Sequence, residues 1–324
     1  MAYHLLLFLV DDVIYKRKVE IMEISTQQEG MSIKESIKLF FKINILLVLF
    51  EIAFNIVLIF FSGALSVYSE DKNVNVIILY IRELVSILSY IWVIRRIIKE
   101  INLKENFKLK IQYKPKLKEC IYIILGGIGY RAFYENTLGL LMSNIPMSPW
   151  LESALENAVN ENISYSIPLF IISVIVVAPV FEEIIYRGII LEQLYKRYGS
   201  LKAIGISALL FAIVHLNIHQ GVNGFFLGII LGFIYIKTNS LLLSMFLHFV
   251  NNFLVIISIY LPFLDADSLK FNIVELVCGV LLLLIAYKFF NNIKMDEGRE
   301  FNFNINSKIK SDKVLDMNYN SESK

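Results

Sequence analysis

Runs of apolar residues separated by short polar stretches dominate the chain from about residue 42 onward. A run of about 20 mostly apolar residues can cross a membrane as a helix, and shorter runs fit where they are buried in a bundle. The pattern predicts eight helices: roughly Lys42–Tyr68, Val76–Ile98, Cys120–Ser143, Ser164–Gln193, Ala203–Leu216, Gly224–Ile236, Leu241–Tyr260 and Phe271–Phe290. The fifth and sixth are too short to span alone, so we expect them inside the bundle. The predicted fold is an all-α, polytopic transmembrane helical bundle.

Three segments follow from this pattern. Residues 1–40 are expected to be an N-terminal cytoplasmic segment, and residues 41–290 form the membrane domain. Residues 291–324 are rich in Asn, Lys, Ser and Asp, so they can bury little apolar surface and are expected to be a disordered cytoplasmic tail. The short apolar run Leu5–Val10 is followed at once by Asp11 and Asp12, which is not the pattern of a signal peptide.

Composition supports a membrane protein. Hydrophobic residues make up 56% of the chain and charged residues 19%, against roughly 45–50% and about 25% in soluble domains. The 31 basic and 29 acidic residues nearly balance, which excludes a nucleic-acid partner based on net charge. Cys120 and Cys278 lie far apart without a CxxC spacing, so we assign them no disulfide or metal.

Basic residues predict the orientation in the membrane. They crowd the loop between the second and third helices: Arg95, Arg96, Lys99, Lys104, Lys108, Lys110, Lys114, Lys116 and Lys118. Loops rich in Lys and Arg face the cytoplasm, so this loop and, with eight alternating spans, both termini are predicted inside. A basic cytoplasmic surface of this kind also fits contact with anionic membrane lipid.

Polar side chains in apolar stretches are costly in a membrane, and they are functional candidates. Six such residues are Glu182, Glu183, Arg187, His215, His248 and Asn252. A turn is expected near Gly199 and Ser200. Glu182 lies about 17 residues before Gly199, and His215 lies about 15 residues after Ser200. At 1.5 Å per residue both are roughly 25 Å from the turn along their helices. The two side chains are therefore predicted at a common depth, with a kink at Pro179 as the main perturbation.

The two adjacent glutamates are predicted to differ in role. Glu183 and Arg187 are four residues apart in the favourable order for a helical ion pair. Glu182 lies about 100° around the helix without an obvious basic partner, which suits a general base. The alternative is that all three form a solvated face at a helix end.

The histidines leave alternatives open. His215 alone on an apolar helix is more often a core residue than a catalyst, but His248 and Asn252 share one helix face and could converge on a developing oxyanion. No cofactor is expected. If a metal such as zinc is present, its ligands would be Glu182, His215 and His248; His219 is less suitable, because it follows in a polar loop and the zincin glutamate is missing.

Together these residues carry a three-part pattern: EExxxR at Glu182, Glu183 and Arg187, FxxxH at Phe211 and His215, and HxxxN at His248 and Asn252. Over about residues 168–260 the chain resembles the CPBP family of intramembrane proteases, which includes CAAX prenyl endopeptidases and Abi-type bacteriocin-processing or immunity proteins. The resemblance implies that Glu182 and His215 activate water and that His248 and Asn252 hold the oxyanion. Glu183, Arg187 and Phe211 would support them.

The implied activity is peptide-bond hydrolysis in a bacterial cell membrane. No serine or cysteine is placed as an obvious nucleophile, which favours direct attack by water. The resemblance suggests a prenylated CAAX peptide or a leader peptide as the substrate. One alternative is a non-enzymatic immunity or scaffold protein that keeps the polar network to hold helices together. A transporter is a weaker alternative, since no paired repeats are evident.

Overall fold

The computed structural model describes residues 30–65, 72–102, 107–111, 113–146, 167–260 and 271–295, and every regular element in these ranges is a helix. In chain order the helices are α2 (Ile33–Leu65), α3 (Lys72–Asn102), α4 (Leu117–Tyr134), η2 (Glu135–Gly139), α5 (Leu140–Met142), α7 (Ile167–Ile172), η4 (Ser173–Val177), α8 (Ala178–Glu183), η5 (Ile184–Leu191), α9 (Glu192–Tyr198), α10 (Ser200–Ile213), α11 (Ile218–Thr238), α12 (Leu241–Tyr260) and α13 (Ile273–Asn291). Those labelled η are π-helical stretches within longer helices. The predicted all-α fold is confirmed.

Two long helices pass through these π-helical stretches without a break. One joins α4, η2 and α5, and the other runs from α7 through η4, α8 and η5 to α9. A π-helical turn inserts one residue into the ladder and often marks a functional site. The second helix holds three of the candidate residues, Glu182, Glu183 and Arg187.

Five of the described helices, α2, α3, α11, α12 and α13, are long and apolar enough to cross a membrane. Exposed apolar side chains such as Ile59, Phe60 and Leu84 cover α2 and α3, as expected for surfaces that face lipid. The fold is thus that of a polytopic membrane protein.

The fifth and sixth predicted helices differ in outcome. Helix α10 has only 14 residues and buries Ala203, Ala208 and Phe211, as expected for a helix inside the bundle. Helix α11 has 21 residues and is long enough to span, so the prediction that it is short is wrong. It begins early because the Asn217 side chain accepts a hydrogen bond from the Gln220 N–H and caps the helix. The polar stretch that suggested a loop is the first part of this helix.

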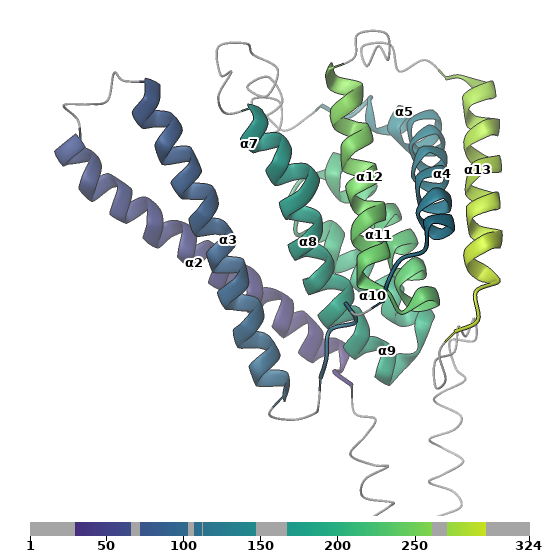
Figure 1. Cartoon of the computed structure of the whole chain (residues 1–324), viewed down its shortest axis with the longest axis horizontal. Coiled ribbons are helices and arrows are strands. Elements are labelled where there is room, and N and C mark those ends of the chain that lie inside the picture. Colours follow the sequence, from purple (N-terminus) through teal and green to yellow (C-terminus); the bar gives the residue numbers. More distant parts are fainter. Residues whose placement is uncertain are drawn as a thin grey trace, which may run out of the picture.

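The helices form a bundle with one splayed side (Figure 1). Helices α2 and α3 lean away from the rest, α8 and α12 lie in the middle, and α4 and α13 pair at the other side. The α4–α13 pair approaches closely at two glycines: a Cβ at Gly129 would lie 2.8 Å from the Gly279 carbonyl oxygen. Small residues of this kind allow close packing between membrane helices.

The basic segments lie at one end of the bundle. The Lys196 ammonium lies 5.6 Å from the centroid of the Phe107 ring, and the Leu241 N–H donates to the Lys110 carbonyl at 3.1 Å. These contacts bring the loop before α4, the end of α9 and the start of α12 together, at the lower end in Figure 1. Their cytoplasmic placement stays a prediction.

The predicted terminal segments fall largely outside the described residues. The described part of the chain starts at residue 30, and α2 begins at Ile33, earlier than the expected Lys42. Most of residues 1–40 and all but the first few residues of the 291–324 tail lie outside the described ranges.

Candidate active site

A π-helical turn just before the two glutamates leaves one backbone carbonyl without a backbone donor. In η4 the Ala178 N–H donates to the Ser173 carbonyl, five residues back. In this register Pro179 would bond the Val174 carbonyl, but proline has no N–H. The Asn252 side chain donates to that carbonyl instead, at 2.9 Å. The predicted kink at Pro179 is thus a π-helical turn, and its freed carbonyl is satisfied from α12.

The predicted ion pair is present and buried. Arg187 Nη1 lies 2.7 Å from Glu183 Oε1, and both side chains are 0% exposed. Arg187 Nη2 also donates to the Gly228 carbonyl at 3.2 Å, and its guanidinium lies 4.5 Å from the centroid of the Phe211 ring. A buried pair needs such additional partners to offset the cost of removing both charges from water. The solvated-face alternative is therefore wrong for Glu183 and Arg187.

Helix α12 holds the other side of Glu183. The Ser244 hydroxyl donates to Glu183 Oε2, and His248 Nδ1 lies 3.0 Å from Glu183 Oε1. Because a carboxylate only accepts, the proton of this bond belongs to His248 Nδ1. The tautomer is inferred from the hydrogen-bond network. With Nδ1 bonded to Glu183, Nε2 on the other side of the ring faces away from Glu183.

His248 therefore lies between the two adjacent glutamates. Its Nε2 is 3.7 Å from Glu182 Oε2, too long for a hydrogen bond but close enough for strong electrostatic coupling. The Glu182 side chain is 24% exposed, whereas Glu183 is fully buried. Of the two carboxylates, Glu182 is the one that water can reach from outside the bundle.

His215 lies in the turn after α10 ends at Ile213. Its Nδ1 donates to the Phe211 carbonyl at 2.8 Å, which leaves Nε2 available for other partners. Glu182 is within electrostatic range of both His215 and His248. The Ser207 hydroxyl donates to the Tyr186 carbonyl at 2.8 Å and fastens α10 to η5. The common depth predicted for Glu182 and His215 agrees with this arrangement.

The Phe211 ring is the centre of the group. It contacts His215 and His248 edge to face, with centroids 5.1 and 5.6 Å away. The same ring lies under the Arg187 guanidinium and is 1% exposed. Such contacts fix the planes of both imidazoles. The structure thus brings the three predicted motifs together around one aromatic side chain.

Asn252 is placed differently from the expectation. Its amide nitrogen donates to the Val174 carbonyl, and its oxygen accepts from the Asn251 amide at 3.0 Å. The sequence predicted that Asn252 and His248 converge on one point. The N–H of Asn252 that bonds Val174 instead links α12 to η4. Asn251, which is 1% exposed, positions the Asn252 amide.

His219 does not join the group. It lies in the first turn of α11, and its Nε2 is 3.0 Å from the Ile145 carbonyl. His215 and His219 belong to different segments, because α10 ends at Ile213 and α11 begins at Ile218. The HxxxH spacing therefore does not place two ligands on one helix face.

The residues of this group do not form a metal site. Among the described side chains, no group of three or more His, Cys, Asp or Glu has an arrangement that could hold a metal ion. Glu182, His215 and His248 in particular do not form such a set. No step below is assigned to a metal.

Three residues contribute to the site without having been predicted from the sequence: Ser244, Gly228 and Asn251. Ser244 precedes His248 by four residues, so helical spacing was a usable signal. Gly228 contributes a carbonyl, and a Cβ there would lie 3.0 Å from the Ala208 Cβ. No sequence pattern shows that a backbone oxygen will face an arginine on another helix.

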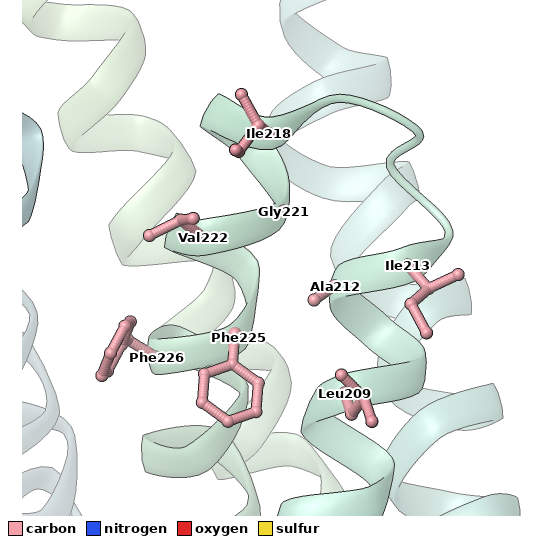
Figure 2. A pocket seen from close by; sticks show the side chains of 8 residues that line it. All are labelled: Leu209, Ala212, Ile213, Ile218, Gly221, Val222, Phe225 and Phe226. Atoms are coloured by element: carbon pink, nitrogen blue, oxygen red, sulfur yellow. The ribbon is translucent and has the colours of Figure 1, made fainter. Parts of the chain in front are cut away.

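A separate apolar groove of about 300 Å³ lies between α10 and α11. Figure 2 shows its lining, with Leu209 and Ile213 on one helix and Val222 and Phe225 on the other. None of the candidate polar residues lines it. This groove is therefore distinct from the polar group around Phe211.

Residues 164–254, which contain all three motifs, match the family model described as Type II CAAX prenyl endopeptidase Rce1-like. This segment is therefore similar to the proteases of that family. Five apolar helices long enough to cross a membrane, and similarity to membrane proteins of two bacteria, support an integral membrane protein of a bacterium.

Two curated proteins show sequence similarity to part of the chain. YdiL of Bacillus subtilis (strain 168), a membrane peptidase by name, is 30% identical over 118 residues, which cover 36% of this chain and 48% of YdiL. The membrane-embedded CAAX protease MroQ of Staphylococcus aureus (strain USA300) is 23% identical over 176 residues, or 52% of this chain and 69% of MroQ. The match to YdiL thus spans about half its length. No solved structure matches the chain significantly.

Proposed function

We propose that this protein is an intramembrane endopeptidase in which Glu182 activates a water molecule for attack on a peptide bond. The observation that carries the proposal is the position of His248 between a buried, fully bonded Glu183 and a reachable Glu182. A carboxylate held beside an oriented imidazole in an apolar surrounding suits general base catalysis. The similarity of residues 164–254 to the CAAX prenyl endopeptidase family model supports the same proposal.

Direct attack by water fits the other side chains. Two buried serines lie close to the candidate residues, and both hydroxyls already donate a hydrogen bond. Ser244 donates to Glu183, and Ser207 donates to the Tyr186 carbonyl. Cys120 and Cys278 lie on α4 and α13, not on the helices that hold the candidate residues. A covalent acyl-enzyme would need a nucleophile beside a base.

We propose that hydrolysis proceeds through a tetrahedral intermediate formed by attack of water. Glu182 takes a proton from water as the water oxygen bonds to the peptide carbonyl carbon, and His215 Nε2 helps to orient that water. His248 Nε2, when both ring nitrogens carry protons, and the second amide hydrogen of Asn252 stabilise the resulting oxyanion. The C–N bond then breaks as Glu182 returns its proton to the leaving amine. Glu183, Arg187 and Phe211 hold these groups in place.

The proposed substrate is a membrane-associated peptide. A C-terminal CAAX-type sequence, with or without a prenyl group, and a leader peptide are the two candidate classes. MroQ carries the CAAX protease name, which favours the first class for this chain. Hydrolysis near lipid also requires that the substrate reach Glu182 from the membrane or its surface.

The test is a cleavage assay with purified protein in liposomes. Wild type is expected to cleave a CAAX-type or a leader peptide, and Glu182→Gln is expected to lose at least about a hundred-fold in rate, the usual contribution of a general base. Glu275→Gln, an exposed glutamate in the first turn of α13, is the matched control and should keep full activity. A Glu182→Gln variant as active as wild type would refute the assignment.

Metal dependence is tested on the same preparation. Because Glu182, His215 and His248 do not form a metal-holding group, cleavage is expected to survive a strong chelator. Loss of activity on chelation, restored by one equivalent of zinc, would contradict the proposed mechanism.

A further inference from the structure

A second cavity shares no lining residue with the candidate active site and lies at the basic end of the bundle. Its volume is about 470 Å³, and it opens between the start of α4 and the ends of α11 and α13. Three lysines line it: Lys116, Lys118 and Lys294. No role in the proposed hydrolysis involves these residues.

The positive charges of this cavity are not neutralised locally. Its one carboxylate, Glu119, is 4% exposed and already bonded: Oε1 accepts from the Tyr113 hydroxyl at 2.5 Å and Oε2 accepts from the Lys116 N–H at 2.8 Å. In the part of the chain that the structure describes, none of the three lysine ammonium groups forms an ion pair with a carboxylate. Three cations around one committed anion leave an excess of positive charge in a hollow.

One side of the cavity is apolar. Phe289 near the end of α13 and Ile293 just after this helix line it, and Lys118 lies 5.5 Å from the centroid of the Phe289 ring. Next to it on the helix surface are Leu117 and Ile285, which are 79% and 48% exposed. The cavity is thus polar and cationic on one side and continuous with lipid-facing apolar side chains on the other.

The place of the cavity in the fold fits its cationic side and its apolar side. The cavity lies at the lower ends of α4 and α13 in Figure 1, the end where the basic segments gather. Positive pockets between membrane helices at the cytoplasmic surface suit the phosphate groups of anionic lipids. The start of α4 adds the partial positive charge of a helix N-terminus.

We propose that this cavity binds the phosphate of an anionic phospholipid, with Lys116, Lys118 and Lys294 around the headgroup and the acyl chains along the apolar surface of α4 and α13. Free phosphate shares the charged part of this chemistry but cannot use the apolar surface. The two sources therefore differ in a measurable way. The inference does not depend on the proposed peptidase activity.

The experiment measures lipid binding to the detergent-purified full chain by native mass spectrometry. Phosphatidylglycerol is expected to bind with a 1:1 stoichiometry that phosphatidylcholine does not reproduce. Each lysine near an anionic headgroup contributes roughly a five-fold gain in affinity. The triple variant Lys116→Gln, Lys118→Gln, Lys294→Gln should therefore bind phosphatidylglycerol about a hundred-fold more weakly.

Two variants control for charge and folding. Lys34→Gln, Lys38→Gln, Lys108→Gln removes three exposed lysines outside the cavity and changes the net charge equally; it should bind as wild type does. Replacing the three cavity lysines by arginine keeps the charges and should keep most of the binding.

Three outcomes would overturn the proposal. The first is equal loss of binding in both glutamine variants, which would indicate a general charge effect. The second is equal binding of phosphatidylcholine. The third is displacement of the lipid by millimolar inorganic phosphate alone, which would make free phosphate the ligand.

Discussion

His248 gives two neighbouring glutamates different environments. Its Nδ1 bonds Glu183, which also pairs with Arg187, and its Nε2 faces Glu182. Adjacent residues on a helix point about 100° apart. The Glu183 carboxylate therefore lies in the packed interior, while the Glu182 carboxylate is partly exposed. The same rotation that makes Glu183 structural leaves Glu182 for chemistry.

Ser244 is expected to matter through Glu183 rather than through substrate. Ser244→Ala removes a hydrogen bond to a buried carboxylate, and stability should fall by about 1–3 kcal/mol, with a smaller loss of activity as His248 loosens. Thermal unfolding in detergent measures the first effect and peptide cleavage the second. The control is Ser258→Ala on the same helix, where the hydroxyl bonds only the Val255 carbonyl. Equal small effects in both variants would contradict a role for Ser244.

At the scale of single elements, the π-helical turn before Pro179 and the side chain of Asn252 form one unit. Asn252 fills the hydrogen bond that Pro179 cannot make to Val174. Pro179→Ala would supply the missing N–H. The two residues should therefore be coupled in stability.

A double-mutant cycle measures this coupling. Asn252→Ala alone should cost about 1–3 kcal/mol of stability, because it leaves the partly buried Val174 carbonyl unpaired. In the Pro179→Ala background the same change should cost clearly less, since the backbone takes over the bond. Activity should stay low in both backgrounds if Asn252 also holds the oxyanion. Additive stability effects would show that the two residues are not coupled.

The crossing of α10 and α11 depends on a glycine. A Cβ at Gly228 would lie 3.0 Å from the Ala208 Cβ and 3.3 Å from Arg187 Nη2. Gly228→Ala should therefore lower stability by roughly 1–3 kcal/mol through overpacking and also displace the arginine.

Gly205→Ala is the matched control for this change. A Cβ at Gly205 meets nothing within 4 Å, and the residue lies inside helix α10. This variant should be as stable as wild type or more stable by up to about 1 kcal/mol, because alanine favours the helix. Unfolding curves of the two variants compare them directly. Similar destabilisation of both would contradict the close approach at Gly228.

At the scale of the whole molecule, the basic end is predicted to face the cytoplasm. In a variant without Cys120 and Cys278, Lys108→Cys should be protected from a membrane-impermeant thiol reagent in intact cells, and Asn144→Cys should react. Both side chains are exposed: Lys108 lies in the basic segment before α4, and Asn144 lies just after α5. In Figure 1 these two segments are at opposite ends of the bundle. The reverse labelling pattern would show the opposite orientation.

Local spacing predicted part of this molecule and long-range contacts decided the rest. The Glu183–Arg187 pair follows from an i,i+4 spacing, and the helices in the described part of the chain follow from apolar runs. The bond from Asn252 to Val174 depends on a π-helical register, which apolar periodicity does not reveal. The early start of α11 depends on the Asn217 cap, a signal that a polar stretch conceals.

The central claim is that Glu182 acts on water while Glu183 holds the site together, and the most direct measurement compares Glu182→Gln with Glu183→Gln in cleavage rate and unfolding. Glu182→Gln should unfold like wild type, within about 1 kcal/mol, and lose at least about a hundred-fold in rate. Glu183→Gln should lose roughly 3–5 kcal/mol of stability, because it leaves Arg187 buried without its partner. An active Glu182→Gln variant, or a Glu183→Gln variant as stable as wild type, would contradict this division of roles.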